Sequence, residues 1–186
     1  MRFDIRPYKV LDFDIENRPL SYWFDGQCTA EITAIAASFG PDEIVRVWLL
    51  GQDEPVTILE SFRRMYDAAD VVTGHYIRKH DLPIINGAML EYGLPPLGPK
   101  MTSDTKLDLV KIKDMSLSQE SLGAMYGLSQ PKVHMTQDDW RKANRLQRID
   151  LTRKRVVADV RQHQMLRMTL INQGMLSAPQ MWEPGD

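Results

Sequence analysis

The chain has 186 residues, of which 43% are hydrophobic and 26% are charged, and its formal net charge is −2. This length and composition predict a single globular domain over residues 1–186, with a loose tail from about residue 175. Because the net charge is close to zero, the protein has no overall basic character that would by itself indicate a nucleic-acid partner. One cysteine, Cys28, excludes an intrachain disulfide. No apolar run approaches the ~20 residues of a membrane helix and no signal peptide is recognisable, so we expect a cytoplasmic, soluble protein without a membrane partner.

The first part of the chain predicts three strands, over residues 8–16, 30–39 and 43–50. Residues 17–19 contain a proline and should end the first strand. The turn Gly40-Pro41-Asp42 separates the second strand from the third. Strands joined by short turns are antiparallel neighbours, so these three form a meander.

Helices and short strands alternate over the rest of the chain. Helical spacing of apolar residues, caps and breakers predicts helices over residues 54–69, 82–92, 118–126, 137–146 and 151–172. A short apolar strand is predicted over residues 70–74, and a further short element begins near residues 103–105. A meander followed by alternating elements predicts an α/β fold whose mixed sheet, with five strands, combines the meander with parallel strands and is flanked by helices.

The most informative feature is an acidic first strand, Val10-Leu11-Asp12-Phe13-Asp14-Ile15-Glu16. Alternate side chains of a strand point the same way, so its three acids share one face and the apolar residues between them share the other. Like charges so close together disfavour ionisation. A divalent cation with oxygen ligands, such as Mg²⁺ or Mn²⁺, resolves that conflict.

Two further aspartates have two readings each. Asp81 comes directly before Leu82-Pro83, which opens a predicted helix, so it is either the helix N-cap or a metal ligand. Asp159 lies in an apolar stretch of the last helix, on one stripe with Arg155 and His163. It is either an ion-pair partner of Arg155 or a metal ligand, because an unpaired buried aspartate is costly.

Three segments, in order, resemble the motifs of the DEDD (DnaQ-like) 3′–5′ exonuclease superfamily. They are Phe13-Asp14-Ile15-Glu16, the segment from Gly74 to Pro83, and Val157-Ala158-Asp159-Val160. Between the last two, Asp104-Thr105 and the segment from Leu117 to Gly123 are similar to exonucleases related to the proofreading domain of family B DNA polymerases.

This resemblance implies a ribonuclease H-like fold and a metal-dependent 3′–5′ exonuclease of DNA repair or replication. The implied substrate is the 3′ end of a single-stranded nucleic acid, DNA rather than RNA, and a DNA polymerase is a candidate partner. The implied cofactors are two Mg²⁺ or Mn²⁺ ions, held by Asp14, Glu16, Asp81 and Asp159. By the same analogy, Asp14 bridges the two ions.

The chain departs from the family at the general base. The family has a tyrosine four residues before the last aspartate or a histidine five before it, whereas Arg155 and Lys154 stand there. Neither suits a base, since arginine stays protonated in proteins. His163, one turn beyond Asp159, is the candidate replacement, with His75, Tyr76 and His80 of the second motif as others.

Cations and an aromatic residue near these motifs are the candidates for nucleic-acid binding. They are Tyr76, Arg78 and Arg155, because guanidinium groups pair with phosphate. Two other functions are compatible with the same motifs. One is an exonuclease-like module that has lost catalysis and binds nucleic acid or protein, and the other is an endonuclease or resolvase on a ribonuclease H-like fold.

Overall fold

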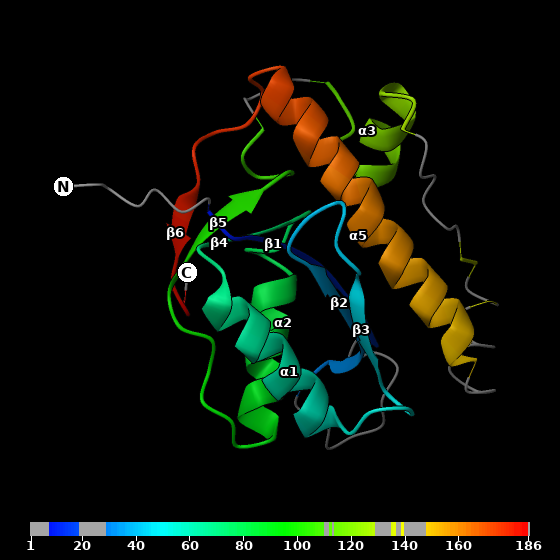
Figure 1. Ribbon diagram of the computed structural model, residues 1–186, viewed down its shortest axis with the longest axis vertical. Helices are drawn as coiled ribbons and strands as arrows, with labels where there is room; N and C mark the ends of the chain where they lie inside the picture. The colour runs from blue at the N-terminus through cyan, green and yellow to red at the C-terminus, as the bar shows by residue number, and fades with distance from the viewer. Residues whose placement is uncertain are drawn as a thin grey trace.

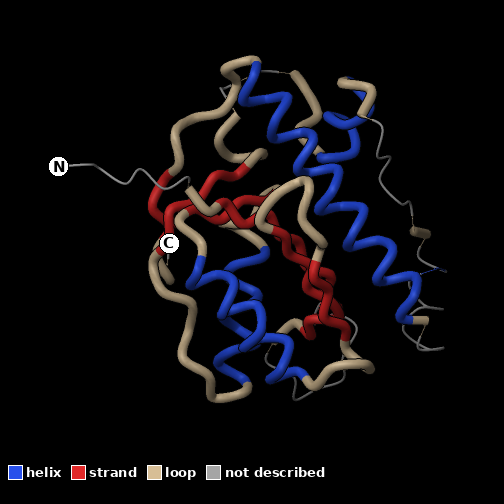
Figure 2. The backbone as a smooth tube through the Cα atoms, in the orientation of Figure 1, coloured by secondary structure: helices blue, strands red, loops and turns tan. Residues whose placement is uncertain are grey.

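The computed structural model describes residues 8–18, 29–109, 112, 114–128, 135–136, 139 and 148–185. A six-stranded mixed sheet forms the middle layer, and helices cover both of its faces (Figures 1 and 2). The strands are β1 (Val10–Arg18), β2 (Glu31–Ser38), β3 (Arg46–Leu49), β4 (Val71–Gly74), β5 (Lys100–Asp104) and β6 (Gln180–Trp182). The helices are α1 (Pro55–Ala68), α2 (Asp81–Glu91), α3 (Gln119–Met125) and α5 (Ile149–Asn172). The predicted α/β class is therefore confirmed.

The sheet has the strand order β3-β2-β1-β4-β5-β6. The pairs β1–β2 and β2–β3 are antiparallel, as the predicted meander requires. The pairs β1–β4 and β4–β5 are parallel. The acidic first strand thus lies where the antiparallel half of the sheet meets the parallel half.

The prediction of five strands and a loose C-terminal tail was wrong. Residues Gln180–Trp182 form β6, which pairs antiparallel with β5, and the Trp182 side chain is buried in the main core. Three residues between two prolines are too few to show strand alternation in a sequence. The pairing depends on β5, which is distant along the chain.

Each face of the sheet has its own core. Helices α1 and α2 pack on the face that receives the apolar residues of β1, including Phe13 against Phe62 of α1. Helix α5 packs on the opposite face, where Ala34 and Ala36 of β2 contact Val156 and Val160. These alanines are small, so the helix can approach the sheet closely, and α5 consequently lies over the acidic side of β1 (Figure 1).

Most element boundaries lie within a few residues of the prediction. Ser118 caps α3 as expected, accepting a hydrogen bond from the Ser121 backbone N–H. β1 continues through Arg18 instead of ending at Glu16, with a bulge directly after that glutamate. The predicted helix over residues 137–146 lies outside the described residues apart from Asp139, as does Cys28. Within the described ranges, no helix combines the length and apolar character needed to cross a bilayer.

Candidate metal centre

The acidic side of β1 faces helix α5. Every fourth residue of that helix turns toward the strand: Arg155, Asp159, His163 and Arg167. The helix runs opposite to the strand, so Arg155 meets Glu16 at one end and Arg167 meets Asp12 at the other. Side chains face the contact at every second residue of the strand and at about every fourth residue of the helix. Charged side chains of the two elements therefore come into register along the contact.

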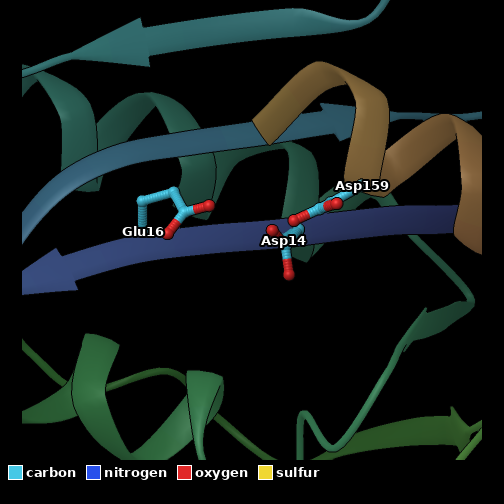
Figure 3. Close-up of side chains that lie close together, drawn as sticks. All are labelled: Asp14, Glu16 and Asp159. Atoms are coloured by element: carbon cyan, nitrogen blue, oxygen red, sulfur yellow. The ribbon is translucent and has the colours of Figure 1, made fainter. Parts of the chain in front are cut away.

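Three carboxylates gather at one end of this contact. Asp14, Glu16 and Asp159 each offer an oxygen, and these oxygens all lie within 4.8 Å of one another. We call these three residues the acidic cluster. Figure 3 shows Asp159 reaching from α5 toward Asp14 on β1, with Glu16 further along the strand. The β1 bulge comes directly after Glu16, and bulges commonly re-aim side chains beside functional sites.

Arg155 lies beside the acidic cluster. Its Nε is 2.8 Å from Oδ2 of Asp159 and 3.4 Å from Oε1 of Glu16. The ion pair with Asp159, one of the two readings of that aspartate, is thus present in the structure. The interpretation of Asp159 as a metal ligand is also compatible with the structure, because the same carboxylate belongs to the acidic cluster.

The other end of the contact is a buried ion-pair group, formed by Asp12, His163 and Arg167. The Asp12 carboxylate is fully buried and accepts two hydrogen bonds from Arg167, from Nε and Nη2, at 3.0 Å each. The Nδ1 of His163 lies 3.1 Å from Oδ1 of Asp12. Burial alone would raise the pKa of Asp12, but the hydrogen bonds and charges of His163 and Arg167 outweigh it and lower that pKa. The charge of Asp12 is therefore balanced by protein groups.

His163, the sequence candidate for the general base, belongs to this buried group. Its side chain is 2% exposed, and its Nδ1 lies 3.1 Å from Oδ1 of Asp12. A base role for His163 stays a prediction. Nearby, burial and then the charge of His163 lower the pKa of His75 to about 4, so His75 is neutral at physiological pH.

Asp81 is not one of the three acids of the acidic cluster. It is the first residue of α2, and the helix N-cap is His80, so the N-cap reading of Asp81 was wrong. Its buried carboxylate is 3.3 Å from Nδ1 of His80 and makes a backbone hydrogen bond with Ile15 of β1. Burial raises the pKa of Asp81, and the hydrogen bond and charge of His80 oppose that rise. Its role as a metal ligand stays a prediction.

Asp104 at the end of β5 holds the second motif in place, a role that the sequence did not reveal. Its carboxylate accepts backbone N–H groups of Tyr76, at 2.9 Å, and Arg78, at 3.2 Å. It also accepts those of Lys106 and Leu107, at 3.0 Å each. Tyr76 has a φ of 74°, an uncommon value for a non-glycine residue, and these hydrogen bonds support it.

The candidate nucleic-acid residues of the second motif have protein partners. The Arg78 guanidinium pairs with the buried Asp108 and donates to Oε1 of Gln180 at 2.8 Å. The Lys106 Nζ lies 4.0 Å from the centre of the Tyr76 ring, a cation–π contact that places a positive charge beside this loop. Contacts of Tyr76, Arg78 and Arg155 with a nucleic acid stay predictions.

Gln119, the first residue of α3, was also missed. Its buried amide donates to the backbone carbonyl of Asp159 at 2.9 Å and to Oε1 of Gln162 at 3.2 Å. A Cβ atom at Gly123 would lie 2.7 Å from Nε2 of Gln162, so the glycine allows α3 to approach α5. The motif from Leu117 to Gly123 therefore braces the turn of α5 that carries Asp159.

The chemistry of the acidic cluster fits a divalent cation. Carboxylate oxygens are the preferred ligands of hard ions such as Mg²⁺ and Mn²⁺. Three of them from two elements, mutually within 4.8 Å, can approach one ion together. The same proximity is unfavourable for three anions without a cation beside them.

Comparisons with known proteins support the fold alone. No family model matches the chain. No curated protein matches it either. Among solved structures, the chain is similar to the family B DNA polymerase of the hyperthermophilic archaeon Pyrobaculum calidifontis, with a TM-score of 0.68 and 17% identity.

The similarity covers 89% of this chain but only 25% of the polymerase chain. It extends over most of the present sequence, and it agrees with the observed mixed sheet between helices. The fold is therefore ribonuclease H-like, as the sequence motifs predicted.

Proposed function

We propose that this chain is a divalent-metal-dependent 3′–5′ exonuclease acting on single-stranded nucleic acid, DNA rather than RNA. The observation that carries the proposal is the acidic cluster, in which Asp14, Glu16 and Asp159 come from β1 and α5. These are three of the four acids in the DEDD resemblance, and they meet in a fold that matches a family B DNA polymerase chain. A role in DNA repair or replication beside a polymerase is part of the proposal.

In this proposal, Asp14, Glu16 and Asp159 would hold one ion, and Asp81 would help to hold a second. Two ions, Mg²⁺ or Mn²⁺, would make a bound water nucleophilic and stabilise the charge that develops on the phosphate. Water adds to phosphorus and the bond from phosphorus to the 3′-oxygen of the preceding nucleotide breaks. The products are a nucleoside 5′-monophosphate and a strand with a new 3′-hydroxyl, which takes up a proton.

The loop of the second motif, within the segment from Gly74 to Pro83, would contact the nucleic-acid strand. The Lys106 ammonium over the Tyr76 ring supplies a cation, and the ring offers a stacking surface for a base. Asp104 fixes the backbone of this loop through its hydrogen bonds to Tyr76 and Arg78, so the loop is preorganised relative to β1.

The test is release of nucleotides from end-labelled oligonucleotides with Mn²⁺ or Mg²⁺. Asp14→Asn and Asp159→Asn should each abolish release, because each removes a charged ligand. Asp150→Asn is the matched control, since Asp150 is an exposed acid on the same helix that pairs with Arg148 outside the acidic cluster. DNA and RNA of equal sequence compare the two substrates.

Retained activity in Asp14→Asn or Asp159→Asn contradicts the assignment. A closed circular single strand separates the exonuclease from an endonuclease or resolvase, because an exonuclease has no end at which to start. A module that binds without catalysis is favoured by one observation, the ion pairs of Arg155 with two acids of the cluster. Strand binding without metal-dependent release would support that alternative.

A further inference from the structure

Arg155 contacts the oxygens that a metal ion would need. Its Nε lies 2.8 Å from Asp159 and 3.4 Å from Glu16, and both of these acids belong to the acidic cluster. The Arg155 side chain is 14% exposed, so its charge is largely shielded from water. It is therefore a built-in cation at the edge of the candidate metal centre.

A guanidinium and a divalent ion compete for the same carboxylates. Both need the lone pairs of Glu16 and Asp159, and two cations side by side repel each other. Arginine stays protonated throughout the physiological pH range, so this competition cannot be relieved by loss of a proton. Only movement of the side chain removes it.

We propose that Arg155 is a displaceable counter-ion, which a divalent ion must move off Glu16 and Asp159 to bind in the acidic cluster. This inference rests on the proposed metal-dependent function. It adds the requirement that Arg155 moves before the metal can bind. In the metal-free protein, Arg155 balances the charges of Glu16 and Asp159. When an ion binds, the released guanidinium is free to pair with a phosphate group, for which its planar fork is suited.

Metal affinity of the wild type and of Arg155→Met tests the proposal. Methionine keeps much of the side-chain volume and removes the charge. Mn²⁺ binding, followed by the electron paramagnetic resonance signal of free Mn²⁺, should be tighter in Arg155→Met by about tenfold or more, because the ion no longer has to displace a positive charge from Glu16 and Asp159.

Arg153→Met is the matched control. Arg153 lies two residues away on α5, and its guanidinium donates to Oε1 of Gln52 at 2.7 Å. This variant also loses one positive charge from the same helix, so a general effect of net charge would appear in both variants. Its Mn²⁺ affinity should equal that of the wild type.

The outcomes separate the inference from the proposed function. If the wild type binds Mn²⁺ and Arg155→Met binds it equally or more weakly, the inference is overturned and the metal site stands. If neither protein binds Mn²⁺, the proposed metal-dependent function fails, and the inference fails with it. An equal gain in Arg153→Met also overturns the specific role of Arg155.

A second measurement needs no variant and covers the case in which Arg155→Met does not fold. The Nε–H resonance of Arg155 in a proton–nitrogen NMR spectrum of the wild type should shift as Mg²⁺ is added. An unchanged Arg155 resonance at saturating Mg²⁺ would show that the guanidinium stays in place and would overturn the inference.

Discussion

Asp12 and Asp14 lie on the same face of β1, one strand repeat apart, and their surroundings are opposite. Asp12 is fully buried, and Arg167 and His163 balance its charge through hydrogen bonds. Asp14 is partly exposed, and its carboxylate lies near those of Glu16 and Asp159. One strand thus carries an acid that anchors a helix and, about 7 Å further on, an acid suited to a cation.

The difference comes from the helix, not from the strand. Helix α5 places Arg167 and His163 over the buried ion-pair group, and it places Asp159 and Arg155 over the acidic cluster. The identity of every fourth helix residue therefore decides which strand acid is structural and which is available for chemistry. Asp12→Asn and Asp14→Asn test this division, and His75→Asn tests the surroundings of His163 in the buried ion-pair group; the three are described in order of expected effect.

Asp12→Asn should cause the largest loss of stability. It removes the negative charge from a buried group and leaves Arg167 without its carboxylate, so the free energy of unfolding should fall by about 3–5 kcal/mol. Urea denaturation in EDTA measures the change. Asp150→Asn, which breaks the exposed pair with Arg148, serves as control and should leave the midpoint unchanged. A similar midpoint for both variants would contradict a structural role for Asp12.

His75 should make stability depend on pH. Its pKa is about 4 in the folded protein and 6.5 ordinarily, because burial and the neighbouring charge of His163 oppose protonation. Above pH 6.5 the histidine is neutral in both states, so this contribution to stability is complete there. As the pH falls from 6.5 toward 4, only the unfolded chain gains the proton, and stability should decline by up to about 1.4 kcal/mol per pH unit.

Unfolding free energies of the wild type and His75→Asn at several pH values isolate this effect, since the difference between the two curves removes the acids that titrate in both. The asparagine amide can still meet the Oγ1 of Thr105, the partner of the His75 Nδ1 at 3.0 Å. If the unfolding free energies of the two proteins change in parallel between pH 6.5 and pH 4, the lowered pKa of His75 is contradicted.

Asp14→Asn should have the smallest effect on the metal-free protein and the opposite sign. Neutralising one of three neighbouring carboxylates reduces their repulsion, so stability in EDTA should stay level or rise by up to about 1 kcal/mol. The same change should abolish the rise in melting temperature that Mn²⁺ gives the wild type, because a ligand that binds only the native state stabilises it. A loss in EDTA as large as that of Asp12→Asn would place Asp14 with the structural acids.

The sequence was sufficient for features that depend on local geometry. Strand alternation correctly put Asp12, Asp14 and Glu16 on one face, because the period of a strand is a property of the backbone. The same holds for the stripe that joins Arg155, Asp159 and His163 on α5. The predicted meander and the order of the elements also followed from short-range turn signals.

The sequence was not sufficient for features that depend on distant partners. The pairing of Arg167 with Asp12 joins residues 155 positions apart, and no local pattern encodes it. The role of Asp104 depends on a backbone turn at Tyr76 that only the folded loop reveals. The three residues of β6 form a strand by pairing with the free edge of β5. Their own sequence therefore contains no pattern that predicts a strand.

The contact between β1 and α5 also has a consequence for protein synthesis. His163 follows Asp12 by 151 residues, and Asp159 comes from the same helix. At translation speeds of about 5–20 residues per second, the ribosome needs roughly 8–30 seconds to add that many residues. During that time a growing polypeptide carries Asp14 and Glu16 but lacks their helical counterpart. The acidic cluster therefore stays incomplete until helix α5 has been translated and has docked on the sheet.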